Sequence, residues 1–230
     1  MPTIGTNLYG GVEPVGKTQI KTMFFMIGYL PLSALDSYYY IVGSERPADN
    51  QPLFGLRDQF LAVRLERPYP KSVKFGYLRS WFAAISGMVS LVFLAQIFGK
   101  PFVEGLAFTL LSAGVWISSI IVWIWAISAG NKVENDQDRL IRTIADKILG
   151  IALDPKYIEI TAKTSIKDHL KEKMKAENRE ELDSTRLNAN HPRTLAFHLL
   201  LARCLQQPQA RDTGEILRLI EILKPHYPGN

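Results

Sequence analysis

Residues 80–98 read SWFAAISGMVSLVFLAQIF, a run of 19 residues without a charged side chain. At about 1.5 Å of rise per residue, a helix of this length spans roughly the 30 Å hydrocarbon core of a bilayer. A second charge-free run, residues 105–130, reads GLAFTLLSAGVWISSIIVWIWAISAG. Backbone polar groups in hydrocarbon must bond within their own segment, and neither run alternates as a barrel strand does, so both runs predict transmembrane α-helices. The alternative, a buried hairpin in a soluble core, is disfavoured by two charge-free runs of this length.

The charges of the chain lie almost entirely outside these runs. The chain has 27 Lys and Arg against 22 Asp and Glu, yet residues 80–131 contain only Lys100 and Glu104. The connector 99–104 is too short to form a domain, so the two helices are expected to be antiparallel neighbours. Basic residues flank both outer ends of the hairpin, and the positive-inside rule therefore predicts an integral membrane protein with both termini in the cytoplasm or its organellar equivalent. The expected location is a bacterial inner membrane.

Two sets of residues within the runs suggest how the hairpin is held. An aromatic belt at the cytoplasmic interface is predicted from Trp81, Trp123 and Trp125. Small residues at four-residue spacing mark faces where helices approach closely, and they are Ala83, Gly87, Ser86, Ser90, Gly114 and Ser118. Two interpretations of these faces stay open, packing within the hairpin and contact with other subunits or a second copy. No ionisable residue lies inside either run, which argues against a self-sufficient transporter.

The N-terminal third of the chain is predicted from its apolar and proline content. Residues 1–21 read as a flexible lead-in, and residues 44–79 as a proline-rich, basic cytoplasmic loop. Residues 22–43 form a third apolar run, which Pro31 interrupts and Asp36 charges. We expect a membrane-docked helix there, with a third span as the alternative. The tyrosines Tyr38, Tyr39 and Tyr40 fit an interfacial anchor or a packed protein contact.

Residues 11–18 read GVEPVGKT and satisfy the G-x-x-x-x-G-K-[ST] pattern of phosphate-binding loops. In such a loop Gly11, Gly16, Lys17 and Thr18 would cradle phosphates and magnesium. The loop requires a buried strand before it, and residues 1–10 contain no hydrophobic run. Nucleotide binding is therefore the weaker interpretation, and no cofactor is predicted.

Residues 131–230 are predicted to form a helical cytoplasmic domain. An apolar stripe indicates an amphipathic helix over 134–152, and a capping box at Ser165 indicates a second helix. Pro192 suits the first turn of a third helix, and Asp212 or Thr213 can cap a fourth. The four histidines and the single Cys204 lack metal-ligand spacing, so no metal site is predicted.

Together these patterns predict an all-α membrane protein: a two-helix transmembrane hairpin, a possible third membrane-embedded N-terminal segment and a helical cytoplasmic C-terminal region. The expected function is a non-enzymatic integral membrane subunit that anchors or scaffolds a larger assembly, such as a bacterial secretion or transport machine. Its expected partners are membrane lipid, other protein subunits and a possible second copy, with no nucleic acid. The rival functions are an oligomerising, membrane-perturbing effector and a nucleotide-binding protein using GVEPVGKT.

Overall fold

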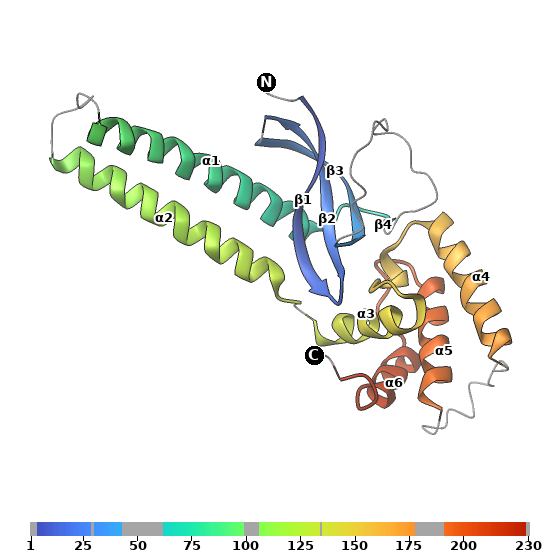
Figure 1. The fold of residues 1–230 in the computed structure, drawn as a ribbon. Coiled ribbons are helices and arrows are strands. Elements are labelled where there is room, and N and C mark those ends of the chain that lie inside the picture. Colours follow the sequence, from blue (N-terminus) through green and yellow to red (C-terminus); the bar gives the residue numbers. More distant parts are fainter. Residues whose placement is uncertain are drawn as a thin grey trace. The chain divides into compact units, whose positions relative to one another are not determined.

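The computed structural model describes residues 4–28, 30–42, 62–98, 106–133, 135–177 and 191–228. The predictions made for residues 44–61 and for the connector 99–104 lie outside the described residues. Within the described ranges the chain forms a four-stranded sheet followed by six α-helices (Figure 1). The prediction of an all-α fold is therefore wrong.

The N-terminal residues form a meander of β-strands. Strands β1 (Ile4–Val15), β2 (Thr18–Ile27), β3 (Leu30–Ile41) and the short β4 (Ala62–Arg64) are hydrogen-bonded in the order β1-β2-β3-β4. A two-residue turn joins β1 to β2, which makes these strands an antiparallel hairpin. Gly16 and Gly28 have positive φ angles of 56° and 63° at the two tight turns, a conformation that glycine adopts without strain. Residues 4–15 are thus a strand, where the sequence predicted a flexible lead-in.

The predicted docked helix over residues 22–43 is wrong because residues 22–27 belong to β2 and residues 30–41 to β3. In β2 every second residue is buried, and these residues are Thr18, Ile20, Thr22, Phe24 and Met26. The outward-facing Met23, Phe25 and Ile27 are apolar as well. The sequence therefore shows one continuous hydrophobic run, without the alternation of apolar and polar residues that marks a strand.

The tyrosine cluster lies on β3, at its pairing with β4. Tyr38, Tyr39 and Tyr40 pair with Arg64, Val63 and Ala62 in antiparallel register. The fold buries Tyr39 and Tyr40, and the ring centroid of Tyr39 lies 5.4 Å from Cζ of Arg142. This placement is that of a packed protein contact, so the membrane-interface role predicted for these two tyrosines is corrected.

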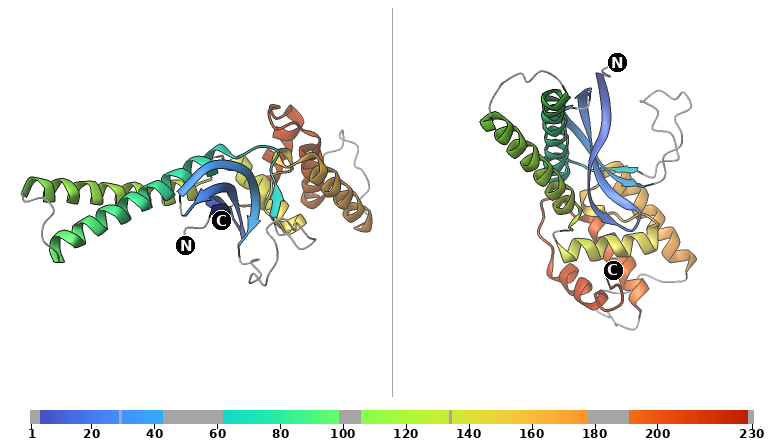
Figure 2. Two further views of the ribbon diagram at one scale, coloured as in Figure 1. Left: turned by 90° about the horizontal axis from the view of Figure 1, so that it is seen from above. Right: turned by 60° about the vertical axis from the view of Figure 1, so that its left-hand side comes forward.

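Two long antiparallel helices follow the sheet, α1 (Pro70–Phe98) and α2 (Leu106–Asn131). Figure 2 shows them running side by side in both views. The first helix begins ten residues before Ser80, where the charge-free run starts. Its first turns therefore lie outside the predicted span and are available for packing against protein.

The C-terminal region forms a helical core. Its elements are α3 (Asp136–Leu149), the 3-10 turn η1 (Pro155–Tyr157), α4 (Ile160–Ala176), α5 (Pro192–Leu205) and α6 (Gly214–Leu223). Asn135 caps α3 by accepting a hydrogen bond from the Gln137 amide, and Gly150 ends that helix with a φ of 77°. The core packs apolar side chains of all four α-helices, including Ile144, Leu170, Leu200 and Leu219.

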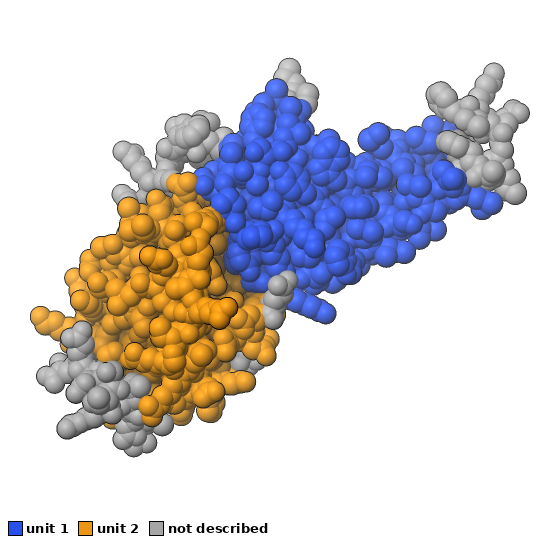
Figure 3. Space-filling model, turned by 180° about the vertical axis from the view of Figure 1, so that it is seen from behind, with its two compact units in different colours: residues 1–13, 20–37, 68–132 blue, residues 14–19, 38–67, 133–230 orange. Residues whose placement is uncertain are grey.

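The chain divides into two compact units, shown in Figure 3. The hairpin unit comprises residues 1–13, 20–37 and 68–132, and the helical unit comprises residues 14–19, 38–67 and 133–230. Strands β1, β2 and β3 each contribute residues to both units.

Candidate functional site

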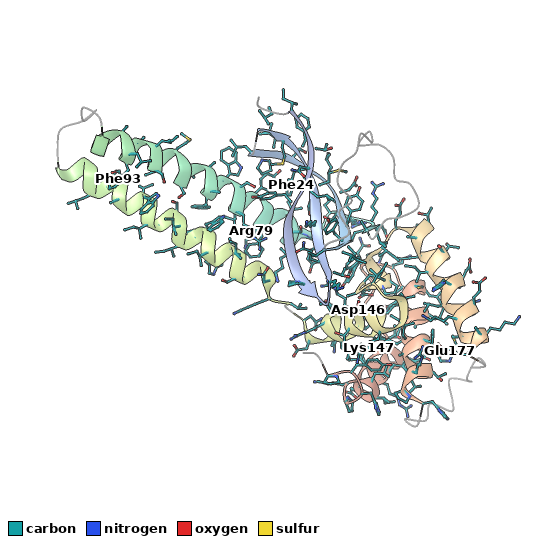
Figure 4. All side chains as sticks on the ribbon, viewed as in Figure 1. Phe24, Arg79, Phe93, Asp146, Lys147 and Glu177 are labelled. Carbon is teal, nitrogen blue, oxygen red and sulfur yellow. The ribbon has the colours of Figure 1, made fainter. Side chains whose placement is uncertain are left out.

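The base of the helical hairpin is where the sheet, α1 and α2 of the hairpin unit meet. We call this junction the hairpin root; it comprises residues 10–13, 69–79 and 126–132. Arg79 lies at its centre and points from α1 toward α2 (Figure 4). Its Nη1 donates to the carbonyl of Gly11 at 2.6 Å, and its Nη2 donates to the carbonyls of Ala126 at 3.1 Å and Ile127 at 3.3 Å.

Carbonyls near the end of α2 carry the negative pole of the helix dipole, so they stabilise the Arg79 cation. The guanidinium also occupies the space that a side chain at position 130 would take: a Cβ on Gly130 would collide with Nη2 of Arg79. Arg79 therefore locks the first turns of α1 to the last turns of α2 and to β1. It holds the two helices in fixed register at this end of the hairpin.

Strand β1 approaches α1 through two glycines. Gly10 has a φ of 70°, and a Cβ on it would lie 2.5 Å from the carbonyl oxygen of Ser72. The hydroxyl of Ser72 donates to the carbonyl of Gly10 at 2.8 Å. On the helix side, a Cβ on Gly76 would lie 2.6 Å from Cζ of Phe24. This backbone contact requires glycine at both positions, so the sheet is seated closely on the first turns of α1.

An ion pair lies at the other end of the root. Lys71 Nζ lies 3.0 Å from Oε1 of Glu13, whose side chain is buried, and it also donates to the carbonyl of Lys132. The phenol of Tyr69 donates to Glu13 Oε2 at 3.0 Å. The root is thus built from charged groups whose described contacts lie within the protein, as expected at the boundary between a soluble fold and an apolar span.

Above the root, both helices expose large apolar side chains. In α1 these include Ile85, Met88 and Leu91, and in α2 they include Leu110, Ile121 and Ile124. Among the described residues, the segments Pro70–Ala95 and Leu110–Asn131 are long and apolar enough to cross a membrane. In water this surface would be costly, at about 25 cal/mol per Å² of apolar area.

The predicted belt tryptophans lie on the exposed surface just above the root. Trp81 is 43% exposed and Trp123 is 40% exposed. Trp125 lies beside the root, with its ring centroid 5.9 Å from that of Phe75. All three tryptophans thus lie within three residues of the root in the sequence.

The small-residue faces divide into two groups. Ser86 and Ser90 are half-buried, the Ser90 hydroxyl donates to the Ser86 carbonyl at 2.7 Å, and Trp116 Nε1 donates to that hydroxyl at 2.7 Å. In contrast, Ala83, Gly87, Gly114 and Ser118 are exposed. A Cβ built on Gly87 or on Gly114 would meet no atom within 4 Å. The hairpin itself leaves these positions uncovered.

The phosphate-loop pattern forms the β1–β2 hairpin in the structure. Gly11 lies within β1, Gly16 and Lys17 form the turn, and Thr18 starts β2. The Thr18 hydroxyl is buried and accepts a hydrogen bond from the Ala152 amide at 3.1 Å. A phosphate-binding loop leads directly into a helix N-terminus, whereas this turn leads into a strand. The Thr18 hydroxyl therefore stabilises the packing of the helical unit.

The helical unit contains a buried charge cluster that the sequence analysis did not find. Arg203 lies 3.1 Å from Asp154 Oδ2 and also pairs with Asp212, which in turn lies 3.3 Å from Lys156 Nζ. Burial raises the pKa of Asp154, while the nearby Arg203 cation opposes that rise. The four residues come from η1, the end of α5 and the segment before α6, so no local spacing signals the cluster. It ties these elements together.

Metal binding finds no support in the ranges that the structure describes. They contain no group of three or more His, Cys, Asp or Glu side chains arranged to hold a metal ion. The chain matches no protein-family model, no curated protein and no solved structure.

Proposed function

We propose that this chain is a non-enzymatic integral membrane protein that anchors a helical domain to a membrane and presents it to other subunits. The observation that carries the proposal is the exposed apolar surface of α1 and α2 above a root of satisfied charges. A bilayer would cover this surface and remove its apolar side chains from water. The backbone polar groups of the two helices need no water there, because they are hydrogen-bonded within each helix. The exposed tryptophans near Arg79 support an interface at that level.

The proposed orientation follows from the hairpin and its flanking charges. Both outer ends of the hairpin lie at the root, since Lys71 bonds the carbonyl of Lys132 and Arg79 bonds that of Ala126. The basic residues of the flanks support a cytoplasmic position for this end by the positive-inside rule. Sheet and helical unit would then both be cytoplasmic, in a bacterial inner membrane.

Partner binding is supported by two kinds of uncovered surface. Within the hairpin, the exposed Gly87 and Gly114 leave room for a close helix–helix contact, with another subunit or a second copy. Within the helical unit, Ile160 and Leu205 flank a cavity and are 69% and 71% exposed. Exposed apolar side chains beside a cavity are typical of protein contacts.

Cysteine accessibility tests the proposal. Single cysteines at Asn7, Lys100 and Lys224, each in a Cys204→Ser background, would be probed in intact cells with a membrane-impermeant maleimide. We expect labelling from outside only at Lys100→Cys, and labelling of the other two only after permeabilisation. Recovery of the parent protein from the soluble fraction, without detergent, would contradict membrane insertion. Labelling of Asn7→Cys from outside would contradict the orientation.

A further inference from the structure

Large apolar side chains are exposed at one end of the sheet, within the hairpin unit. They are Ile4, Phe25, Ile27 and Leu32, which we call the sheet tip. These residues share one end because β1 and β2 are antiparallel and joined at Gly16–Lys17, so the start of β1 lies beside the end of β2. The turn at Gly28 brings the start of β3 to the same end.

The outward face of β2 changes character along its length. Near the Gly16–Lys17 turn this face carries Gln19 and Lys21, and toward the tip it carries Met23, Phe25 and Ile27. The strand is therefore polar where it leaves the turn and apolar where it reaches the tip. A gradient of this kind along one strand is expected where one end is in water and the other meets an apolar phase.

The contacts between the sheet and α1 show which way the tip points. The backbone amide of Tyr69, just before α1, donates to the hydroxyl of Ser37 at 2.8 Å. Farther along the helix, the phenol of Tyr77 donates to the carbonyl of Leu32 at 3.1 Å. Moving along β3 from Ser37 to Leu32, toward the tip, is thus moving along α1 toward its exposed apolar run.

Strand β2 gives the same direction independently. Phe24 stacks edge-to-face on Tyr77, with ring centroids 5.2 Å apart. Ile27 lies three residues beyond Phe24, which is about 10 Å along a strand. Trp81 lies four residues beyond Tyr77, which is about 6 Å along a helix. The tip and Trp81 therefore both lie beyond the Phe24–Tyr77 contact, in the direction of the exposed apolar run.

We infer that the sheet tip inserts into the interfacial region of the bilayer beside the hairpin, as a second, shallow membrane contact. This rests on the proposed insertion of the hairpin. The bilayer is the occupant because the tip and the apolar run of α1 both lie beyond the Phe24–Tyr77 contact, toward the same end of one unit. The exposed Lys74, on the first turns of α1, adds a cation near the headgroups. The contact fixes the sheet against the membrane surface at a depth of about 5–10 Å for its apolar side chains.

Fluorescence in vesicles tests this inference with the full-length protein. Ile27→Cys and Leu32→Cys, each in a Cys204→Ser background, would carry an environment-sensitive fluorophore and be reconstituted in phosphatidylcholine with phosphatidylglycerol. Lys132→Cys is the matched control at the far end of the root, and Met88→Cys is the reference within the span. Each label would be challenged with a lipid bearing a nitroxide near its headgroup and with aqueous iodide.

The expected result is a blue shift and nitroxide quenching of the labels at positions 27 and 32, with protection from iodide, while the label at position 132 stays open to iodide. If Met88→Cys is protected but positions 27 and 32 behave like position 132, the inference is overturned and the proposed hairpin stands. If Met88→Cys is itself open to iodide, the hairpin does not insert and both proposals fall. A blue shift at positions 27 and 32 in vesicles without quenching by the nitroxide lipid would instead indicate a protein contact at the tip, which also overturns the inference.

Discussion

The guanidinium of Arg203 lies 3.1 Å from the carboxylate of Asp154, and both side chains are 1% exposed. The contact is an ion pair, and Oδ2 of Asp154 has no hydrogen-bond donor among the described residues. A buried cation depends on such a partner, because an uncompensated charge in the interior is strongly destabilising.

Asp154→Ala should therefore lower the free energy of unfolding of the helical unit by about 3 kcal/mol. Cys204, the neighbour of Arg203, provides the readout, since it is buried and reacts with a fluorogenic maleimide only when α5 opens. Heating the detergent-solubilised protein with this reagent gives the unfolding temperature. Glu177→Ala is the control, because its ion pair with Arg193 leaves that arginine 51% exposed and is worth at most about 1 kcal/mol. Equal shifts for the two variants would contradict the prediction.

Cys204 itself should react slowly in the native protein. Burial raises its pKa from 9.0 to about 11, which lowers the thiolate fraction near neutral pH by about 100-fold. The stability that this protonated thiol contributes is complete below pH 9.0 and is lost as the pH rises through about 11. Alkylation rates measured against pH, with and without denaturant, check this. Equal rates at pH 8 in the native and unfolded states would show that the thiol is not buried.

Gly130→Ala should destabilise the hairpin root. The new methyl group displaces Arg79 from the carbonyls of Ala126 and Ile127, at an expected cost of about 1–3 kcal/mol for hydrogen bonds to a charged group. Gly114→Ala, in the same helix, meets open space and should be neutral or stabilising by up to about 1 kcal/mol. Thermal loss of helical circular dichroism in detergent compares the two. The prediction fails if Gly130→Ala melts no earlier than Gly114→Ala.

The β1–β2 turn should behave as a structural turn in mutagenesis. Thr18→Val leaves the buried Ala152 amide without its acceptor and should cost about 1–3 kcal/mol. Lys17→Ala changes an exposed side chain and should stay within about 0.5 kcal/mol. The free energies of unfolding of both variants and a direct nucleotide titration distinguish a structural turn from a phosphate-binding loop. Saturable, magnesium-dependent ATP binding that Lys17→Ala abolishes would refute the proposed non-enzymatic function.

Gly87→Leu and Gly114→Leu should each weaken association with other helices. Both positions face open space in the hairpin, so a leucine leaves the hairpin intact but separates the backbones of any partner helix. Membrane levels should stay normal, while the detergent-solubilised assembly loses partners or a second copy. Ile117→Leu is the control, because it also introduces a leucine at an exposed position of α2 but leaves the side-chain volume unchanged. Unchanged assembly mass for both glycine variants would place the partner contacts elsewhere.

The sequence by itself determined the position of the hairpin and much of the C-terminal helical pattern. Charge is absent from residues 80–98 and 105–130, and a long helix is the local consequence of such a run. Helix α5 begins at Pro192, because a proline at the first helical position needs no amide partner. These signals are readable because each depends on residues close together in the chain.

Only the tertiary structure decided the sheet, the root and the exposure of the glycines. Residues 23–27 are apolar on both faces of β2, so composition could not distinguish strand from helix, and strand pairing is set by partners elsewhere in the chain. Arg79 meets Ala126 across two helices, and Asp154 meets Arg203 across 49 positions of sequence. Spacing within a sequence cannot report such contacts, because close packing and charge pairing are properties of the folded chain in three dimensions.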